Sequence, residues 1–257
     1  MKITFLGTGT SQGVPLIACD CHVCQSDDPR DKRLRSSVMI EDNGTNIIID
    51  AGPDFRQQML REDVRKVDAL LITHGHKDHI GGLDDIRAFN YVSGKPMDVY
   101  ASAQTNLDIK RDLYYVFTEN RYPGIPKINL IDVAENHPFK VRGFEVLPIK
   151  VSHHFLDILG FRIGDFTYIT DCRTLPASSI EMAMNTRILV LNALRKREHI
   201  SHLNLEQALE IIEKTKANKA YITHISHQMG RHDEVSKELP AHVELAYDGL
   251  KIVTSDE

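Results

Sequence analysis

Residues 72–82 read Ile-Thr-His-Gly-His-Lys-Asp-His-Ile-Gly-Gly, and they continue an apolar segment, Ala69–Thr73, that is typical of a buried strand. Three imidazoles (His74, His76 and His79) and the carboxylate of Asp78 therefore fall within six residues. In a turn just past a strand, alternate side chains converge, so His74 and His76 are placed to bind one ion and Asp78 and His79 a neighbouring one. Imidazole suits Zn, Fe, Ni and Cu, and the carboxylate also admits Mn. The glycines of the stretch are expected to let the backbone turn tightly beside the ions.

Further polar residues also follow segments that the sequence predicts to be strands. His153 comes shortly after Phe144–Val151, and Asp171 and His224 each directly follow a shorter apolar run. Strands that end in metal-capable residues indicate a site on one rim of a sheet scaffold. The predicted strands are Lys2–Leu6, Ser37–Glu41, Asn46–Asp50, Ala69–Thr73, Asp98–Ala101, Phe144–Val151, Phe166–Thr170, Ile188–Leu191, Ala220–Thr223 and Leu250–Val253.

Amphipathic segments alternate with these strands, which predicts a layered α/β architecture. In the last such segment Leu205, Leu209 and Ile212 form an apolar stripe at helical spacing, and Asn204 is a suitable N-cap. The predicted helices are Phe55–Arg61, Asp84–Tyr91, Ala103–Phe117, Ser178–Asn185 and Leu205–Lys216.

Size and charge limit the classes of function. The 257 residues are enough for one large core or for two small domains, and no apolar run approaches the roughly 20 residues that cross a bilayer. Met1–Gly7 reaches a glycine too early for a signal peptide, so it is interpreted as a first strand and the cytoplasm is the expected location. The formal net charge of −5 disfavours a protein that holds long nucleic acid.

Three of the four cysteines stand together as Cys19-x-Cys21-x-x-Cys24. A secreted disulfide framework would need more cysteines in a shorter chain, so clustered thiols here indicate a metal site. The fourth, Cys172, is expected to pack as a small buried residue.

His-x-His-x-Asp-His after an apolar strand is the signature of the metallo-β-lactamase superfamily, which this sequence resembles over essentially its whole length. The resemblance implies an αββα sandwich of two mixed β-sheets flanked by helices, formed by a single domain of residues 1–257 with an N-terminal zinc loop at about residues 13–35. The other matching motifs occur in the family's order: Phe5–Thr10, Ile49–Gly52, Ser152–His153, Ile169–Asp171 and Ile222–His224.

Within the superfamily, the sequence most resembles the phosphoribosyl cyclic phosphodiesterases of phosphonate breakdown. The resemblance rests on Gly13-Val14-Pro15 before the cysteines and on Thr223-His224-Ile225-Ser226-His227. It implies one structural zinc, for which three thiolates and one imidazole would form a closed tetrahedral shell. The implied ligands of that zinc are Cys19, Cys21, Cys24 and His227.

The same resemblance implies two divalent ions, Mn or Zn with Fe as a further option, at a second site. One ion would be held by three histidines, the other by an aspartate and two histidines, and one aspartate would bridge both. These ligands are, in that order, His74, His76 and His153; Asp78, His79 and His224; and Asp171.

Asp50 and His202 are expected to act beside these ions, so that with Asp78 they complete the predicted catalytic set. Asp50 would accept the second N–H of a ligand histidine. By the same resemblance His202 would protonate the leaving group, a role that suits a histidine of near-neutral pKa, while His199 is expected to be a surface residue. The adjacent His154 is an alternative to His153 as the metal ligand. By resemblance to the family, the spacing to the strand Leu159–Ile163 favours His153.

The predicted function is hydrolysis of a small or cyclic phosphodiester by water that two metal ions activate. One alternative is a tRNA 3′-processing endoribonuclease, but Asp84–Lys150 lacks the glycine-rich basic arm of those enzymes. The other is a thioester or ester hydrolase of the same fold. The expected partner is a small phosphodiester, without membrane and without nucleic acid. Members of this group are often dimers, so a homodimer is one candidate state.

Overall fold

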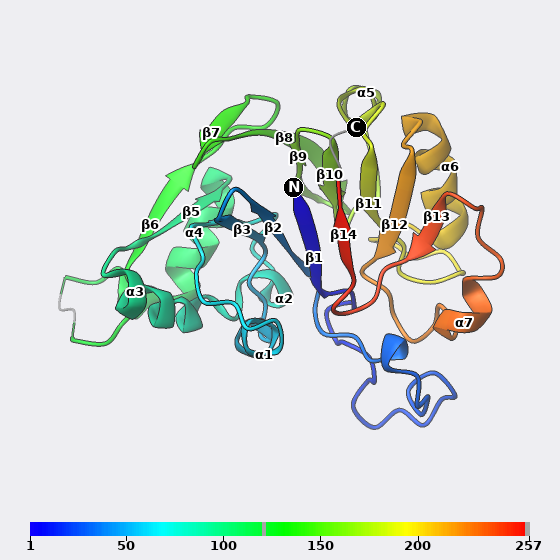
Figure 1. Ribbon diagram of the computed structural model, residues 1–257, viewed down its shortest axis with the longest axis horizontal. Coiled ribbons are helices and arrows are strands. Elements are labelled where there is room, and N and C mark those ends of the chain that lie inside the picture. The colour runs from blue at the N-terminus through cyan, green and yellow to red at the C-terminus, as the bar shows by residue number, and fades with distance from the viewer. Residues whose placement is uncertain (120–121, 255–257) are drawn as a thin grey trace.

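The computed structural model describes residues 1–119 and 122–254 and contains two seven-stranded β-sheets with helices along their outer faces (Figure 1). Both sheets are mixed, since each combines parallel and antiparallel neighbours. This arrangement confirms the αββα sandwich that was expected.

The first sheet has the order β14-β1-β2-β3-β4-β5-β6. Its first four strands pair antiparallel and the rest pair parallel, and β1 lies beside β14, so strands from the two ends of the chain are neighbours (Figure 1). In chain order the strands are β1 (Lys2–Gly7), β2 (Ser37–Asp42), β3 (Thr45–Ile49), β4 (Ala69–Leu71), β5 (Met97–Ala101), β6 (Ile128–Asp132) and β14 (Lys251–Val253).

The second sheet has the order β13-β12-β11-β10-β9-β8-β7. Here β10 to β13 run parallel, and the remaining pairs are antiparallel. In chain order the strands are β7 (Phe139–Val141), β8 (Phe144–His153), β9 (Leu156–Ile163), β10 (Phe166–Ile169), β11 (Ile188–Asn192), β12 (Lys219–Thr223) and β13 (Val243–Leu245). The strands β6, β7 and β13 were not predicted, and β9 begins earlier than expected.

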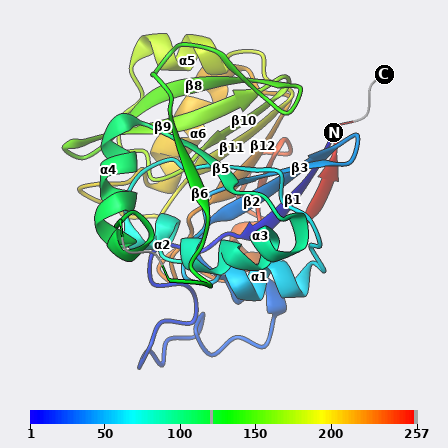
Figure 2. The same cartoon turned by 90° about the vertical axis from the view of Figure 1, so that its left-hand side faces the viewer.

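Helices cover the outer face of each sheet. Figure 2 shows α3 and α4 over the first sheet, and α5 and α6 lie on the second. The helix predicted to reach Phe117 ends at Asp112, and a short 3-10 turn follows it. No helix in the described part of the chain is long and apolar enough to cross a bilayer. The helices are α1 (Phe55–Arg61), α2 (Lys77–Ile80), α3 (Arg87–Ser93), α4 (Ala103–Asp112), α5 (Ala177–Ala183), α6 (Leu205–Thr215) and α7 (His232–Val235), with 3-10 turns at Pro29–Asp31, Leu83–Ile86 and Tyr114–Val116.

The predicted cap of α6 is present. The Asn204 side chain accepts a hydrogen bond from the Gln207 backbone N–H at 2.9 Å, and the Gln207 side chain accepts one from the Asn204 N–H at 3.1 Å. This reciprocal capping box satisfies two N–H groups that the helix leaves free, and it fixes where the segment after His202 becomes helical.

Alternating side chains of the strands separate the core into layers. Large apolar residues from both sheets fill the space between them, and the Phe5 and Tyr221 rings meet there at 5.5 Å between centroids. The opposite faces pack under α1, α3 and α4 on one side and α5 and α6 on the other. Since each sheet is covered on both faces, its rims are where polar side chains can gather.

Candidate metal centre

The structure brings the seven predicted ligands of the paired ions together at the rim of the sandwich. Their ligand atoms form two clusters, and within each cluster all of these atoms lie within 4.8 Å of one another. The first holds three histidines and the second holds two aspartates and two histidines. The members are His74, His76 and His153 in the first, and Asp78, His79, Asp171 and His224 in the second.

The loop after β4 and the short helix α2 that follows it carry four of these side chains, and neighbouring backbone packs tightly against them. A Cβ at Gly52 would lie 2.0 Å from the Asp78 carbonyl oxygen, and one at Gly82 would lie 2.1 Å from the Gly52 carbonyl oxygen. The glycines of residues 72–82 do not have left-handed backbone. Gly81 and Gly82 lie in a turn, as expected, and the contacts that a Cβ would meet show that glycine is also needed there for the close approach of two chain segments.

Three of the strands that lead to the centre are followed, within two residues, by an aspartate or histidine with left-handed backbone. Asp50 after β3 has φ 66°, Asp171 after β10 has φ 57°, and His224 after β12 has φ 55°. Such conformations are uncommon outside glycine and cost free energy. Their position at the rim indicates that the surrounding packing holds these side chains toward the clusters.

The buried nitrogens of the clusters fit metal ions. His74 Nε2 and His79 Nε2 are buried and make no hydrogen bond within the described part of the chain. Buried polar atoms almost always have a partner, and neutral imidazole with carboxylate is a donor set that Zn, Mn and Fe accept. The residues present therefore fit the divalent ions that were expected.

Asp50 lies behind the second cluster and belongs to neither group of ligand atoms. Its Oδ2 lies 2.7 Å from His79 Nδ1, and its Oδ1 accepts a hydrogen bond from the Thr73 backbone N–H at 2.8 Å. Both Asp50 and His79 are fully buried. This geometry is the one expected of a residue that orients a ligand histidine.

Burial and neighbouring charges shift the pKa values of the aspartates and histidines in the centre. Burial alone would raise the pKa of Asp171, but the neighbouring His224 and His79 hold it well below its usual range. Burial works to lower the pKa of His79, yet the carboxylates of Asp171, Asp78 and Asp50 raise it well above normal. Burial and the nearby His79 lower the pKa of His74 well below normal. The centre thus holds ionised carboxylates, which favour bound cations.

His202 lies at the edge of the centre, where it was predicted. Its Nε2 is 3.3 Å from Asp171 Oδ2, and with His153 and Asp171 it forms a further group of potential ligands. His154 is exposed, with its ring against Phe155, so the structure brings His153 rather than His154 to the centre. His199, which was expected to be a surface residue, is half-buried, and its Nδ1 lies 3.2 Å from His202 Nδ1.

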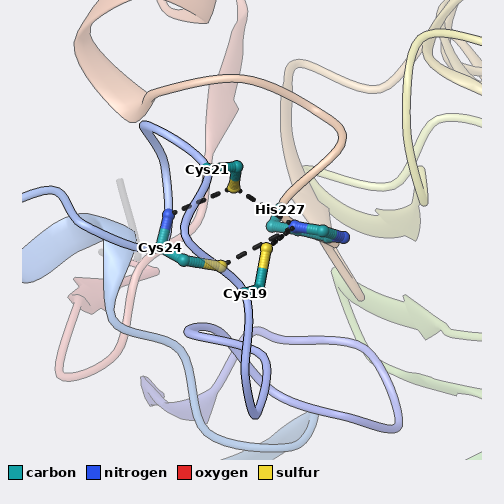
Figure 3. Close-up of side chains that lie close together, drawn as sticks. All are labelled: Cys19, Cys21, Cys24 and His227. Carbon is teal, nitrogen blue, oxygen red and sulfur yellow. Dashed lines mark hydrogen bonds between the residues drawn. The ribbon is translucent and has the colours of Figure 1, made fainter.

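The second predicted site is also assembled (Figure 3). The three thiols and one imidazole point toward a common centre, with His227 Nδ1 at 3.2 Å from Cys19 Sγ, 3.3 Å from Cys21 Sγ and 3.7 Å from Cys24 Sγ. Burial raises the pKa of Cys24 to about 11. At Cys21 burial also opposes ionisation, but hydrogen bonds, first from the Cys24 N–H and then with His227, lower the pKa to about 6. This set fits one closed tetrahedral zinc.

One buried polar network was not predicted. Arg33 is 4% exposed, and it donates hydrogen bonds to Thr8 Oγ1 at 2.8 Å and to the Ala246 carbonyl oxygen at 2.6 Å. Its second amino group lies 3.3 Å from His232 Nδ1, and the His232 backbone N–H bonds to Asp31 Oδ1 at 2.8 Å. Burial lowers the pKa of Arg33 to about 10. These hydrogen bonds connect the end of the N-terminal loop that carries the cysteines to the C-terminal part of the fold.

Cys172 is buried as predicted, and burial raises the pKa of its thiol well above normal. Its backbone N–H donates to Asn192 Oδ1 at 2.7 Å, and the Asn192 amide donates back to its carbonyl oxygen at 3.0 Å. The residue therefore helps to hold the neighbouring Asp171 in place through its backbone.

The chain resembles known proteins over its whole length. It is 42% identical to an octanoyltransferase of Porphyromonas gingivalis over all of its own residues but 52% of that protein, so it spans about half the length of that curated relative. Among solved structures it is similar to a diphosphatase of the PhnP family, with 40% identity, a TM-score of 0.92 and coverage of 99% of this chain and 98% of that one.

A more distant structure, the zinc-bound PqqB of Methylobacterium extorquens, has 19% identity and a TM-score of 0.77 over 99% of this chain and all of that one, which shows the shared fold. The β-lactamase superfamily domain matches residues 45–225. That match includes all seven residues of the two clusters and the strands that carry them. The chain belongs to the β-lactamase superfamily.

Proposed function

We propose that the protein is a metal-dependent hydrolase that cleaves a P–O bond of a small phosphodiester. The observation that supports this most is the position of Asp171 beside both clusters. Its Oδ1 lies 3.0 Å from His224 Nδ1 in the second cluster, and its Oδ2 lies 4.0 Å from His74 Nε2 in the first. One carboxylate that reaches both clusters is what a pair of bridged ions requires.

The residues would divide between the ions as the resemblance implies. His74, His76 and His153 would hold one ion, Asp78, His79 and His224 the other, and Asp171 both. When bound, two such ions supply an activated water and neutralise charge on the phosphoryl oxygens.

The protein's own side chains supply orientation and a proton. Asp50 keeps the His79 proton on Nδ1, so that Nε2 faces the cluster. His202 is positioned to give a proton to the leaving oxygen. Burial lowers its pKa, and the hydrogen bond to Asp171 is the main opposing influence. Histidine is the side chain that most often serves as a general acid.

A second candidate is hydrolysis of a diphosphate linkage, because the similar PhnP-family structure is described as a diphosphatase. The chemistry at phosphorus is shared, since in both cases water displaces an oxygen leaving group. The octanoyltransferase name of the P. gingivalis relative does not support an acyl-transfer function for this chain, because the chain matches only half of that protein.

The test is a substrate panel with added Mn, added Zn or neither. It contains bis(p-nitrophenyl) phosphate, a nucleotide sugar with a diphosphate linkage, a thioester and a precursor tRNA. We expect metal-dependent turnover of the phosphodiester that is lost in His76→Ala and falls at least about 100-fold in His202→Ala. His137→Ala, which removes an exposed histidine, should match the wild type. Turnover of the thioester or the tRNA alone would refute the proposal.

A further inference from the structure

The proposed function gives no role to His199, although its ring lies beside that of His202. The two ring centroids are 5.1 Å apart, and the two Nδ1 atoms are 3.2 Å apart. The chain turns His199 inward, since it is half-buried while the next residue, Ile200, is 70% exposed. His199 therefore contacts the side of His202 that faces away from the paired clusters.

The donors around the two rings decide which nitrogens carry protons. The Ser201 backbone N–H donates to His199 Nδ1 at 3.3 Å. A backbone N–H can only donate, so His199 Nδ1 is an acceptor and carries no proton. Burial lowers the pKa of His199, which keeps its ring neutral. Because two unprotonated nitrogens do not bond to each other, the proton between the rings belongs to His202 Nδ1.

The Ser201 hydroxyl gives the same result. Its Oγ lies 2.9 Å from His202 Nδ1 and 3.2 Å from His199 Nδ1. A hydroxyl can accept one hydrogen bond and donate another, so it accepts from the His202 N–H and donates to the unprotonated His199 nitrogen. Both contacts thus place a proton on His202 Nδ1.

The backbone on either side of His202 is fixed to the centre. The Leu203 N–H donates to the Cys172 carbonyl oxygen at 2.9 Å, and His153 Nδ1 lies 2.8 Å from the Ser201 carbonyl oxygen. The ring of His202 is therefore held between two anchored residues, with Nδ1 toward His199 and Nε2 toward the paired clusters.

We propose that His199 is a positioning residue which, with Ser201, keeps a proton on His202 Nδ1 so that Nε2 transfers the proton to the leaving oxygen. The proposal rests on the proposed function, in which His202 is the proton donor. Without an acceptor at Nδ1, a neutral ring would keep its one proton on Nε2, 3.3 Å from the Asp171 carboxylate. A partner at one nitrogen likewise sets the tautomer of the histidine in Ser-His-Asp hydrolases.

The proton balance of the step is simple. As the P–O bond breaks, its electron pair goes to the leaving oxygen, which takes the Nε2 proton of protonated His202 and becomes a hydroxyl. The neutral ring keeps its Nδ1 proton, which His199 and Ser201 hold throughout. The ring then regains a proton at Nε2 from water.

The test measures hydrolysis of bis(p-nitrophenyl) phosphate by metal-loaded variants. His199→Phe keeps a ring of similar shape but has no acceptor, so kcat should fall at least about fivefold, the size of one net hydrogen bond, with KM unchanged. His199→Asn can place its Oδ1 near the position of Nδ1 and should retain most of the wild-type kcat. The matched control is His137→Phe, at an exposed histidine, and it should behave as the wild type.

A double-mutant cycle separates positioning from a general structural role. If His199 acts through His202, then His199→Phe should cause no further loss of kcat in a His202→Ala background. The same fold loss in both backgrounds would overturn the proposal, and so would a His199→Phe variant with the wild-type kcat.

Failure of the proposed function would have a different signature, since the wild type would then hydrolyse no phosphodiester. In that case a long-range proton–nitrogen correlation spectrum of the isotope-labelled, zinc-loaded protein still tests the position of the proton. The His202 signals are those missing in His202→Ala. The neutral ring should carry its proton on Nδ1 in the wild type and shift toward Nε2 in His199→Phe. A wild type with the proton on Nε2 would show that His199 does not position this ring.

Discussion

The substitution Asp50→Asn tests how the second cluster is held ready for a metal. Asp50 Oδ2 lies 2.7 Å from His79 Nδ1, and Oδ1 accepts from the Thr73 N–H at 2.8 Å. Asparagine keeps the shape and can still accept from Thr73, but it presents an N–H₂ group to His79. Because two donors cannot bond, the His79 proton must move to Nε2, which then has no lone pair for a metal.

The expected loss follows from the burial of this pair. Both side chains are fully buried, so water cannot replace the lost acceptor. Removing an orienting partner of a ligand histidine typically lowers metal affinity about 10- to 100-fold, which corresponds to about 1.4 to 2.8 kcal/mol. The assay is a competition titration with a chromophoric chelator at pH 7, with circular dichroism to verify that the variant is folded.

The matched control is Asp63→Asn, which makes the same chemical change at an exposed residue that pairs only with Arg65 among its described neighbours. It should bind metal as the wild type does. A folded Asp50→Asn variant with wild-type affinity would refute the account of His79. An equal loss in both variants would show that net charge, rather than orientation, sets the affinity.

Three further outcomes are expected. Gly52→Ala places a Cβ 2.0 Å from the Asp78 carbonyl oxygen, so it should lower stability by about 1–3 kcal/mol and reduce bound metal; an unchanged thermal midpoint would contradict this. Cys24→Ser should lower the zinc content by one ion per chain in elemental analysis and leave the paired ions, whereas unchanged zinc would rule out the cysteine site. Burial, and then the charge of Arg33, lowers the pKa of His232 to about 4. The unfolded chain binds that proton near pH 6.5, so stability should fall as pH falls from about 6.5 to about 4. In the His232→Gln variant, the free energy of unfolding measured by denaturant titration should fall less across this pH window than in the wild type. An identical pH dependence of the two proteins would show that His232 does not cause the loss of stability.

Much of the candidate centre could be predicted because its residues are close in sequence or follow strands. Four potential ligands lie within residues 72–82, where the type and spacing of the side chains already favour metal. Asp171 and His224 could be placed because each ends an apolar run, and β10 and β12 are aligned through β11, so both residues reach the same edge.

Other features depend on contacts that no local pattern records. Arg33 bonds to Thr8 and approaches His232, which is 199 positions away in the chain, so nothing near Arg33 marks it as a buried charge. The three-residue strands β7 and β13 are too short for a recognisable alternation and form because longer neighbours offer them hydrogen bonds. The left-handed backbone at Asp50 is likewise set by tertiary packing: aspartate adopts it more readily than most non-glycine residues, but the residue type does not mark which aspartate does so.

The central claim is that the two rim clusters hold a pair of metal ions and that the cysteine cluster holds a third. Anomalous diffraction at the Zn and Mn absorption edges from crystals of the metal-loaded protein tests it most directly. The account predicts two peaks roughly 3.5–4 Å apart, with Asp171 between them, and one zinc peak among Cys19, Cys21, Cys24 and His227. A loaded crystal with no peak at the rim, or with a single peak there, would contradict it.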